Sequence, residues 1–255
     1  MNRSISYNNF DLQNSTYLSA RFRDLDSVKN VNYDFELKGI RGGRKLLNTQ
    51  VDSKTFSVIV IVKGNSMEDL EEKVDTMLAN FYPRQEAPLI IDYAGELREW
   101  DAIVDEVSPT GNLGQAKTRE YQVTFRTTGA GRSFDTQTKQ FANVTDSQVT
   151  QTIDFGGTTE ALPTYTFTVN SEEDLTRIFI KNVNTNSQAL FEQTFSDGDV
   201  VIYDQKTETL TLNGVIQQRL GISPLTPAGS NDIEFTFQST SHDVTIDVEW
   251  NKRYI

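Results

Sequence analysis

The chain has 255 residues, of which 36% are hydrophobic, 24% charged and 10% aromatic, values that indicate a soluble, folded protein. It contains no cysteine, which excludes disulfides, thiolate metal sites and thiol nucleophiles. Its formal net charge of −12 argues against a protein that grips nucleic-acid phosphates, because such proteins need a basic stripe.

The acidic charge is concentrated in the second half of the chain. Residues 1–131 hold 16 basic and 19 acidic residues, whereas residues 132–255 hold 8 basic and 17 acidic ones. This balance is compatible with a surface that DNA passes without adhering, and equally with plain solubility. The longest apolar run, Val58–Val62, is too short to span a bilayer, and the N-terminus has no apolar signal segment, so we expect no membrane association and no secretory signal.

In chain order, the first distinctive segment is a Gly-rich basic stretch from Gly39 to Lys45, which predicts a solvated loop with freedom at positive φ. Thr55–Val62 then forms the strongest predicted strand. It is β-branched almost throughout and apolar on both faces after Ser57, so we expect both of its faces to be covered.

One helix is predicted, over about residues 66–82. Ser66 is a good N-cap, and acidic residues fill the first turns, where they suit the helix N-terminus. Pro83 ends the pattern. Apolar side chains recur at spacings of three and four and predict one core-facing stripe, made of Met67, Leu70, Val74, Met77, Leu78 and Phe81.

Three further strands are predicted at residues 89–93, 97–107 and 121–127. The segment Thr128–Ser133 is small, Gly-rich and poor in apolar residues, so it predicts a linker. We therefore expect an N-terminal domain, residues 1–131, in which one helix packs on β-sheets, and a second domain, residues 132–255.

The second domain is predicted to be all β. Pro163–Val169 alternates threonine with apolar residues, as a half-buried strand should, and Asn213-Gly214 is one of several turn signals. The expected architecture is a sandwich or jelly roll, and the fold class is mainly β. The other predicted strands are residues 175–183, 189–195, 200–203, 209–212, 233–237 and 244–250.

No catalytic, metal or cofactor motif stands out. Asp197-Gly198-Asp199 could suggest a cation site, but a hairpin turn is the better reading. The lone histidine, His242, is expected to be a solvated turn residue. Trp250 with Tyr254 could form a stacking platform for sugars, although packing at a strand end is favoured. We therefore predict no enzyme, no metal and no cofactor.

Several stretches, in order, resemble the distal tail protein (Dit) family of long-tailed, siphovirus-type bacteriophages. In the first half the likeness is carried by Gly42-Gly43-Arg44 before the strand at Thr55, the capped helix at Ser66, and the strands Pro88–Tyr93 and Tyr121–Phe125. In the second half it is carried by residues 198–204, 209–214, 224–233 and 248–254, which look like the galectin-like sandwich of that family. Together the matches cover about three quarters of the chain.

The resemblance implies a structural virion protein, assembled in the host cytoplasm. Such proteins form a homo-hexameric ring that joins the tail tube protein to the tail-tip hub and carries receptor-binding or side-fibre proteins. DNA passes through the channel without specific binding, and acidic residues are hypothesised to line part of it. In the family an extended loop clasps the next subunit; residues 39–54 hold its place, which points to inter-subunit contacts at Arg41, Gly42, Gly43, Arg44 and Lys45.

Other functions remain open from the sequence. A tail-tube or other baseplate component shares a small β fold with a helix, but would form long tubes. A carbohydrate-binding module would fit the galectin-like pattern, yet His242 alone does not supply the His/Arg/Trp/Glu constellation that such binding uses. A glycosidase would need paired carboxylates, and nothing in the sequence singles out a pair.

Overall fold

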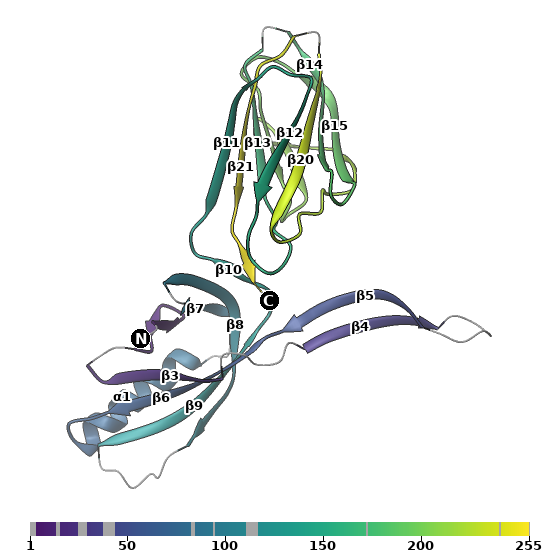
Figure 1. The fold of residues 1–255 in the computed structure, drawn as a ribbon. Coiled ribbons are helices and arrows are strands. Elements are labelled where there is room, and N and C mark those ends of the chain that lie inside the picture. The colour runs from purple at the N-terminus through teal and green to yellow at the C-terminus, as the bar shows by residue number, and fades with distance from the viewer. Residues whose placement is uncertain are drawn as a thin grey trace. The chain divides into compact units, whose positions relative to one another are not determined.

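The computed structural model divides into two compact units, one ending at Phe134 and the other running from Asp135 to Tyr254 (Figure 1). The predicted domain boundary lies three residues before this division. The predicted fold class is confirmed, since both units are mainly β and the one described helix lies in the first. The structure describes residues 4–13, 16–24, 30–37, 44–82, 85–93, 95–110, 117–171, 173–239 and 241–254, with the backbone alone for 23–24, 30–37 and 44–53.

The N-terminal unit is built on an antiparallel sheet with the strand order β2-β1-β7-β8-β9-β6-β3, and β10 pairs with β8. Strand β8 is long enough to pair with β7 through its first half and with β9 through its second half. The strands are β1 (Ile5–Tyr7), β2 (Phe10–Asp11), β3 (Leu18–Asp24), β6 (Thr55–Lys63), β7 (Ala87–Tyr93), β8 (Glu96–Pro109), β9 (Thr118–Thr127) and β10 (Gly131–Ser133).

Strand β6 is a central strand, and its two faces are not equally covered. Phe56, Val58, Val60 and Val62 are fully buried in the core. On the other face Ile59 is buried, but its neighbours Ser57 and Ile61 are only half-buried. The continuous apolar run therefore predicted the strand correctly, whereas the second face is covered only in part.

Helix α1 (Met67–Phe81) covers the buried face of the sheet. Leu70, Val74, Met77 and Phe81 enter the core at the predicted spacing. Met67 does not belong to this stripe, because it is the first helical residue and is 50% exposed. The helix supplies aromatic contacts as well: the Phe81 ring packs edge-on to Phe125 at 6.2 Å between centroids.

The N-cap predicted at Ser66 is present. Its hydroxyl accepts a hydrogen bond from the backbone N–H of Asp69 at 3.1 Å, and so satisfies one of the unpaired donors of the first turn. We expect Ser66→Ala to lower the free energy of unfolding by about 1 kcal/mol. Chemical denaturation followed by circular dichroism would measure this, with Ser66→Asp as the control that retains a capping oxygen and stability close to that of the unaltered chain.

The carboxylate of Asp69 adds a pH dependence to the same turn. It accepts hydrogen bonds from the Asn65 N–H at 2.6 Å and from Lys73 Nζ at 2.7 Å, and these lower its pKa in the folded state. A lowered pKa stabilises the fold above the unfolded-state pKa of about 3.9, and the gain is lost as pH falls through the folded value. Asp69→Asn should therefore melt at a lower temperature at pH 7, and the difference should close below about pH 4. A constant gap across that range would contradict the assignment.

The C-terminal unit is a sandwich of two antiparallel sheets. One has the order β11-β21-β13-β16-β17-β18 and the other β12-β20-β14-β15-β19. The first contains β11 (Gln137–Val144), β13 (Thr164–Val169), β16 (Val200–Asp204), β17 (Thr209–Leu212), β18 (Val215–Gln217) and β21 (Val244–Trp250). The second contains β12 (Gln148–Asp154), β14 (Leu175–Asn182), β15 (Ser187–Phe195), β19 (Leu220–Gly221) and β20 (Ser230–Gln238), and β22 (Arg253–Tyr254) follows β21.

Alternation places the apolar residues of both sheets in one core, as the sequence predicts. In β13 the threonines are half-buried, while Tyr165, Phe167 and Val169 are fully buried. Phe235 from the facing sheet packs edge-on against the Tyr165 and Phe167 rings at 6.1 and 6.0 Å. Aromatic contacts of this kind fix how the two sheets face each other.

The Tyr165 hydroxyl is a weak point of this core. It is buried, burial raises its pKa, and no hydrogen-bond partner for it exists among the described residues. An unsatisfied buried hydroxyl is destabilising. We therefore expect Tyr165→Phe to raise the free energy of unfolding by about 1 kcal/mol. Tyr203→Phe is the matched control: its hydroxyl bonds Ser223 at 2.6 Å, so its loss should destabilise.

Candidate interaction surfaces

A two-stranded ribbon is the first candidate surface. Strands β4 (Asn30–Leu37) and β5 (Arg44–Ser53) pair antiparallel, from Asn30 opposite Ser53 to Leu37 opposite Arg44. They form a sheet of their own, paired with no other described strand (Figure 1). Their outer backbone edges can therefore accept strands of another chain. The ribbon is an insertion between β3 and β6, which are themselves antiparallel neighbours.

The predicted inter-subunit residues fall on this ribbon in part. Arg44 and Lys45 begin β5, opposite Leu37 and Glu36. Arg41, Gly42 and Gly43 lie outside the described residues. The segment predicted as a loop over residues 39–54 is thus regular strand from Arg44 to Ser53. Its contact with a neighbouring subunit stays a prediction.

The open face of the N-terminal sheet is the second candidate. Arg21, Phe22, Ile59, Thr110 and Glu120 line a shallow hollow of about 600 Å³ there. Its charges are of both signs: Arg21 lies 3.8 Å from Glu120, and Arg126 pairs with Asp105 at 2.6 Å. These exposed pairs add little stability, and the exposed Glu106, opposite Thr124 in the β8–β9 pair, adds a further carboxylate to the face.

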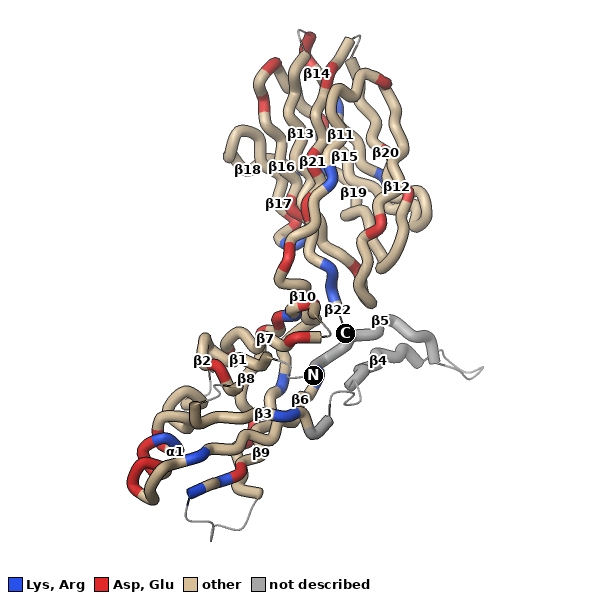
Figure 2. Tube along the Cα trace, turned by 60° about the vertical axis from the view of Figure 1, so that its left-hand side comes forward, with Lys and Arg blue, Asp and Glu red and all other residues tan. Residues whose placement is uncertain are grey.

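The acidic residues of the unit gather elsewhere, on the exposed face of α1 (Figure 2). Glu68, Glu71, Glu72 and Asp75 are exposed there. Arg119 pairs with Glu71, and Lys73 pairs with the neighbouring Asp69, so only part of the negative charge of the helix is neutralised. A nucleic acid would be repelled by this helix and would meet charges of both signs on the open sheet face.

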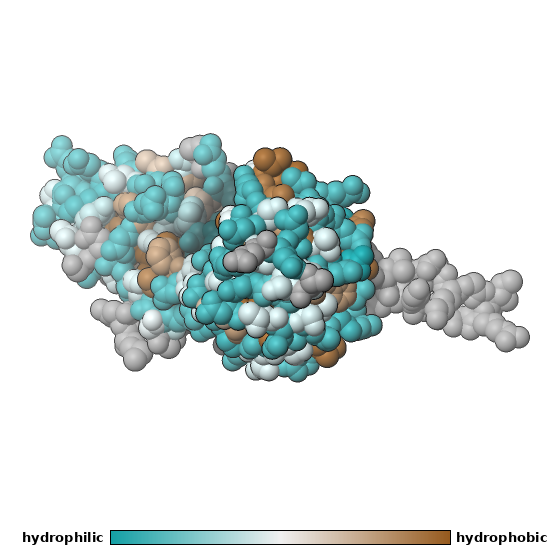
Figure 3. All heavy atoms as spheres, turned by 90° about the horizontal axis from the view of Figure 1, so that it is seen from above, coloured by the Kyte–Doolittle hydropathy of each residue, from teal (hydrophilic) through white to brown (hydrophobic). Residues whose placement is uncertain are grey.

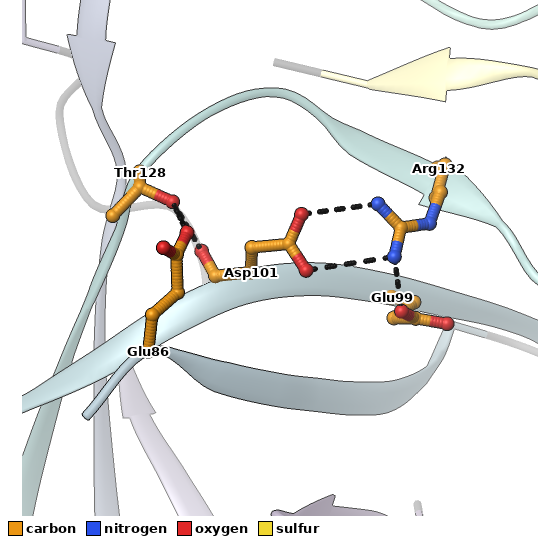
Figure 4. Close-up of polar contacts among 5 residues, drawn as sticks. All are labelled: Glu86, Glu99, Asp101, Thr128 and Arg132. Atoms are coloured by element: carbon orange, nitrogen blue, oxygen red, sulfur yellow. Dashed lines mark hydrogen bonds and ion pairs between the residues drawn. The ribbon is translucent and has the colours of Figure 1, made fainter.

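A polar cluster fixes the end of the N-terminal unit (Figure 4). Arg132 pairs with Glu99 and, at 3.1 Å, with Asp101; both carboxylates come from β8. Burial works against the charged form of Arg132, but these partners more than offset it and raise its pKa. Thr128 donates to Glu86 and lies 3.3 Å from the Asp101 carbonyl. These contacts hold residues 128–132 against β8 and against Glu86, which precedes β7, so the cluster acts as an anchor.

The residues that the sequence offered for chemistry are used structurally. His242 is 7% exposed, and its ring nitrogens lie 3.1 Å from Ser239 Oγ and 3.0 Å from the Asp146 carbonyl, so the expectation of a solvated turn is wrong. The Phe237 ring packs beside the His242 ring at 5.3 Å between centroids, with the two planes tilted by 42°, and so helps to bury it. Asp199 caps its own turn by accepting from the Ser196 N–H and from Asn213. Among the described residues there is no cluster of three or more His, Cys, Asp or Glu side chains that could hold a metal ion.

The two aromatic rings that could have formed a stacking platform for sugars are buried. Trp250 and Tyr254 are 8% and 7% exposed, and the Trp250 indole N–H donates to the Phe155 carbonyl at 3.1 Å. Neither ring presents a face to a sugar. Within the described part of the chain, no helix is long and apolar enough to cross a membrane.

Sequence reasoning missed one surface, on the C-terminal unit. Residues 215–225 carry five exposed large apolar side chains, Val215, Ile216, Leu220, Ile222 and Leu225. The turn before them was recognised: Asn213 and Gly214 have positive φ and join β17 to β18. The sequence does contain a signal for this surface: apolar residues follow that turn without the alternation that would bury them.

Comparison with known proteins gives a coherent result. The family model of the phage tail protein RIFT-related domain matches residues 11–127, and that of the siphovirus-type tail component, C-terminal domain, matches residues 156–254. The crystal structure of SPP1 Dit (gp 19.1), described as a paradigm of the hub adsorption apparatus in phages infecting Gram-positive bacteria, matches with a TM-score of 0.67 and 12% identity over 99% of both chains. A chain of the phage p2 baseplate has a TM-score of 0.41 and 10% identity over 96% of this chain and 97% of its own. No curated protein sequence matches.

Proposed function

The chain belongs to the siphovirus-type distal tail protein family, and from this premise we propose that it forms a homo-hexameric ring at the tail tip. The ring joins the tail tube protein to the tail-tip hub, encloses part of the DNA channel and carries receptor-binding or side-fibre proteins. Its role is structural, in the virion, after assembly in the host cytoplasm. One observation carries the proposal: the two family models match the two structural units separately and in the family's order.

Each unit has a part in this proposal. The N-terminal unit supplies the ring, and the β4/β5 ribbon is its clasp on the next subunit, because its strand edges are free to pair within the described backbone. The C-terminal sandwich, which has a hydrophobic core of its own and an acidic net charge, is the docking unit. In this arrangement the protein acts through binding surfaces and not through reactive groups.

The proposed acidic channel lining is possible only in one orientation of the N-terminal unit. The densest acidic surface of the N-terminal unit is the exposed face of α1, whereas the open face of the sheet carries basic and acidic residues side by side. An acidic channel wall therefore requires α1 to face the channel. If the sheet lines it, DNA passes along a wall of alternating signs. A cryo-electron microscopy reconstruction of the ring decides between the two, and a wall made by the sheet would overturn the acidic lining.

Negative-stain microscopy and mass photometry of the purified protein test the ring itself. We expect closed six-fold rings. Long tubes would favour a tail-tube protein instead. A monomer at all concentrations, both alone and mixed with tail tube and hub proteins, would contradict the proposal.

A further inference from the structure

One edge of the C-terminal sandwich ends in a segment that is paired on one side only. Strand β19 pairs with β15, Leu220 opposite Leu190 and Gly221 opposite Ala189. The chain then continues along β15, where the Ile222 N–H donates to the Gln188 carbonyl at 3.0 Å and the Leu225 N–H to Ser187 Oγ at 2.6 Å. We call residues 220–228 the strap.

The strap carries exposed apolar side chains along a sheet edge. Leu220, Ile222 and Leu225 are 44%, 74% and 48% exposed. The opposite edge of the same sheet is β12, whose exposed side chains are polar, for example Gln148 and Asp154. Figure 3 shows one face of the molecule, on which a few apolar groups stand out from the largely hydrophilic surface of the C-terminal unit. Proteins protect sheet edges with polar residues, so an apolar edge indicates a binding surface.

Buried polar side chains hold the strap in one conformation. Asn182 donates to the Leu225 carbonyl at 2.6 Å, Gln205 donates to the Pro224 carbonyl, and Thr226 donates to the Ala161 carbonyl at 2.7 Å. All three side chains are at most 3% exposed. The exposed leucines are therefore presented on a fixed backbone, which lowers the entropic cost of binding.

A pocket lies where the strap ends. It has a volume of about 320 Å³, and its lining includes the apolar Leu225, Pro227 and Ala228 together with Thr159, Glu160 and Thr185. The volume suits one large side chain of a partner. The surrounding unit, residues 135–254, holds 17 acidic and 7 basic residues, a net charge of −10. The two cations beside the strap are engaged within the chain: Arg219 pairs with Glu208 at 2.6 Å and donates to the Gly221 carbonyl, and Arg253 donates to the Glu160 carbonyl. The acidic excess of the rest of the unit attracts a cationic partner and repels an anionic one.

We propose that the strap and its pocket dock an extended segment of another tail protein, in which an apolar anchor residue is flanked by lysine or arginine. The anchor fills the pocket beside Leu225, the flanking cations lie near Glu160 and the acidic unit, and the segment runs along the open side of β19. This proposal rests on the docking role assigned to the C-terminal unit and names its surface and the chemistry of its partner.

The absence of cysteine makes a direct test possible. An environment-sensitive fluorophore is attached to the full chain at Ile222→Cys, or at Val215→Cys as the matched exposed apolar control. The probes are a short peptide that alternates valine with lysine and its twin that alternates valine with glutamate. We expect saturable binding of the lysine peptide to be reported from position 222 and not from position 215, and no response to the glutamate peptide.

Second-site variants identify the pocket. Leu225→Asp should weaken binding at least about tenfold, and Glu160→Gln a few-fold. Glu249→Gln, which removes the same charge at an exposed position on β21, should leave binding unchanged. An equal response at both labels, no saturation, or binding indifferent to Leu225→Asp would overturn the proposal. A response to protein concentration alone would assign the strap to a second copy of the chain, and would overturn it too.

Ring formation is scored separately on the same samples by negative-stain microscopy. Normal rings without peptide binding would overturn the docking surface and leave the ring role intact. Peptide binding by a protein that never forms rings would contradict the ring and leave the docking surface standing.

Discussion

A chain in which residues 26–53 are replaced by a short Gly/Asn turn should fold normally and lose its rings. The structural reason is that Asp24 lies opposite Ser57 in the β3–β6 pair, so the ribbon is an insertion into a hairpin that a turn can close. The core residues that β3 contributes, Leu18 and Ala20, precede the cut and remain. Mass photometry should find mostly monomer where the unaltered chain forms rings.

A graded variant separates the ribbon's backbone from its charges. Arg44→Glu with Lys45→Glu keeps both strands and reverses the two predicted contact cations. We expect it to weaken ring assembly more at low than at high salt, because exposed ion pairs are screened. Both variants should keep the thermal transition of the unaltered monomer. Rings that persist without the ribbon would contradict its role as the clasp.

The sequence predicts this fold well where local pattern and burial agree. The threonine alternation of β13 and the spacing of Leu70, Val74 and Met77 place the right side chains in the core. Ser66 sits at the helix start because its hydroxyl has a local task. Such signals are short-range, so a single sequence carries them in full.

The functional surfaces depend on distant contacts and are harder to predict. Nothing in residues 39–54 states that Arg44–Ser53 would pair with Asn30–Leu37 outside the main sheet. His242 reads as a polar turn residue, yet the carbonyl of Asp146, almost a hundred residues away, satisfies its ring. The strap's fixed shape depends on Asn182 and Gln205, which the sequence shows only as ordinary polar residues.

The sharpest difference between sequence and structure is at Gly131. Its neighbours suggest a flexible linker, but it begins β10, and Arg132 beside it is anchored on Glu99 and Asp101. A Cβ at position 131 would overlap the indole of Trp100. That indole is 2% exposed and confined by the Phe56 and Tyr93 rings, at 5.0 and 5.8 Å. Glycine is present because the backbone must approach the tryptophan, not because the segment must bend.

Gly131→Ala should therefore lower the free energy of unfolding of the N-terminal unit by about 1–3 kcal/mol, the usual cost of overpacking a well-packed core. Gly131→Val should cost more. Gly129→Ala is the matched control two residues earlier, because a Cβ there meets no heavy atom within 4 Å. It should change stability by less than about 0.5 kcal/mol. Denaturant unfolding of the full chain, followed by tryptophan fluorescence, measures all three. Equal effects of the two alanine substitutions would mean that this segment is the linker its composition suggests and that the contact with Trp100 does not constrain it.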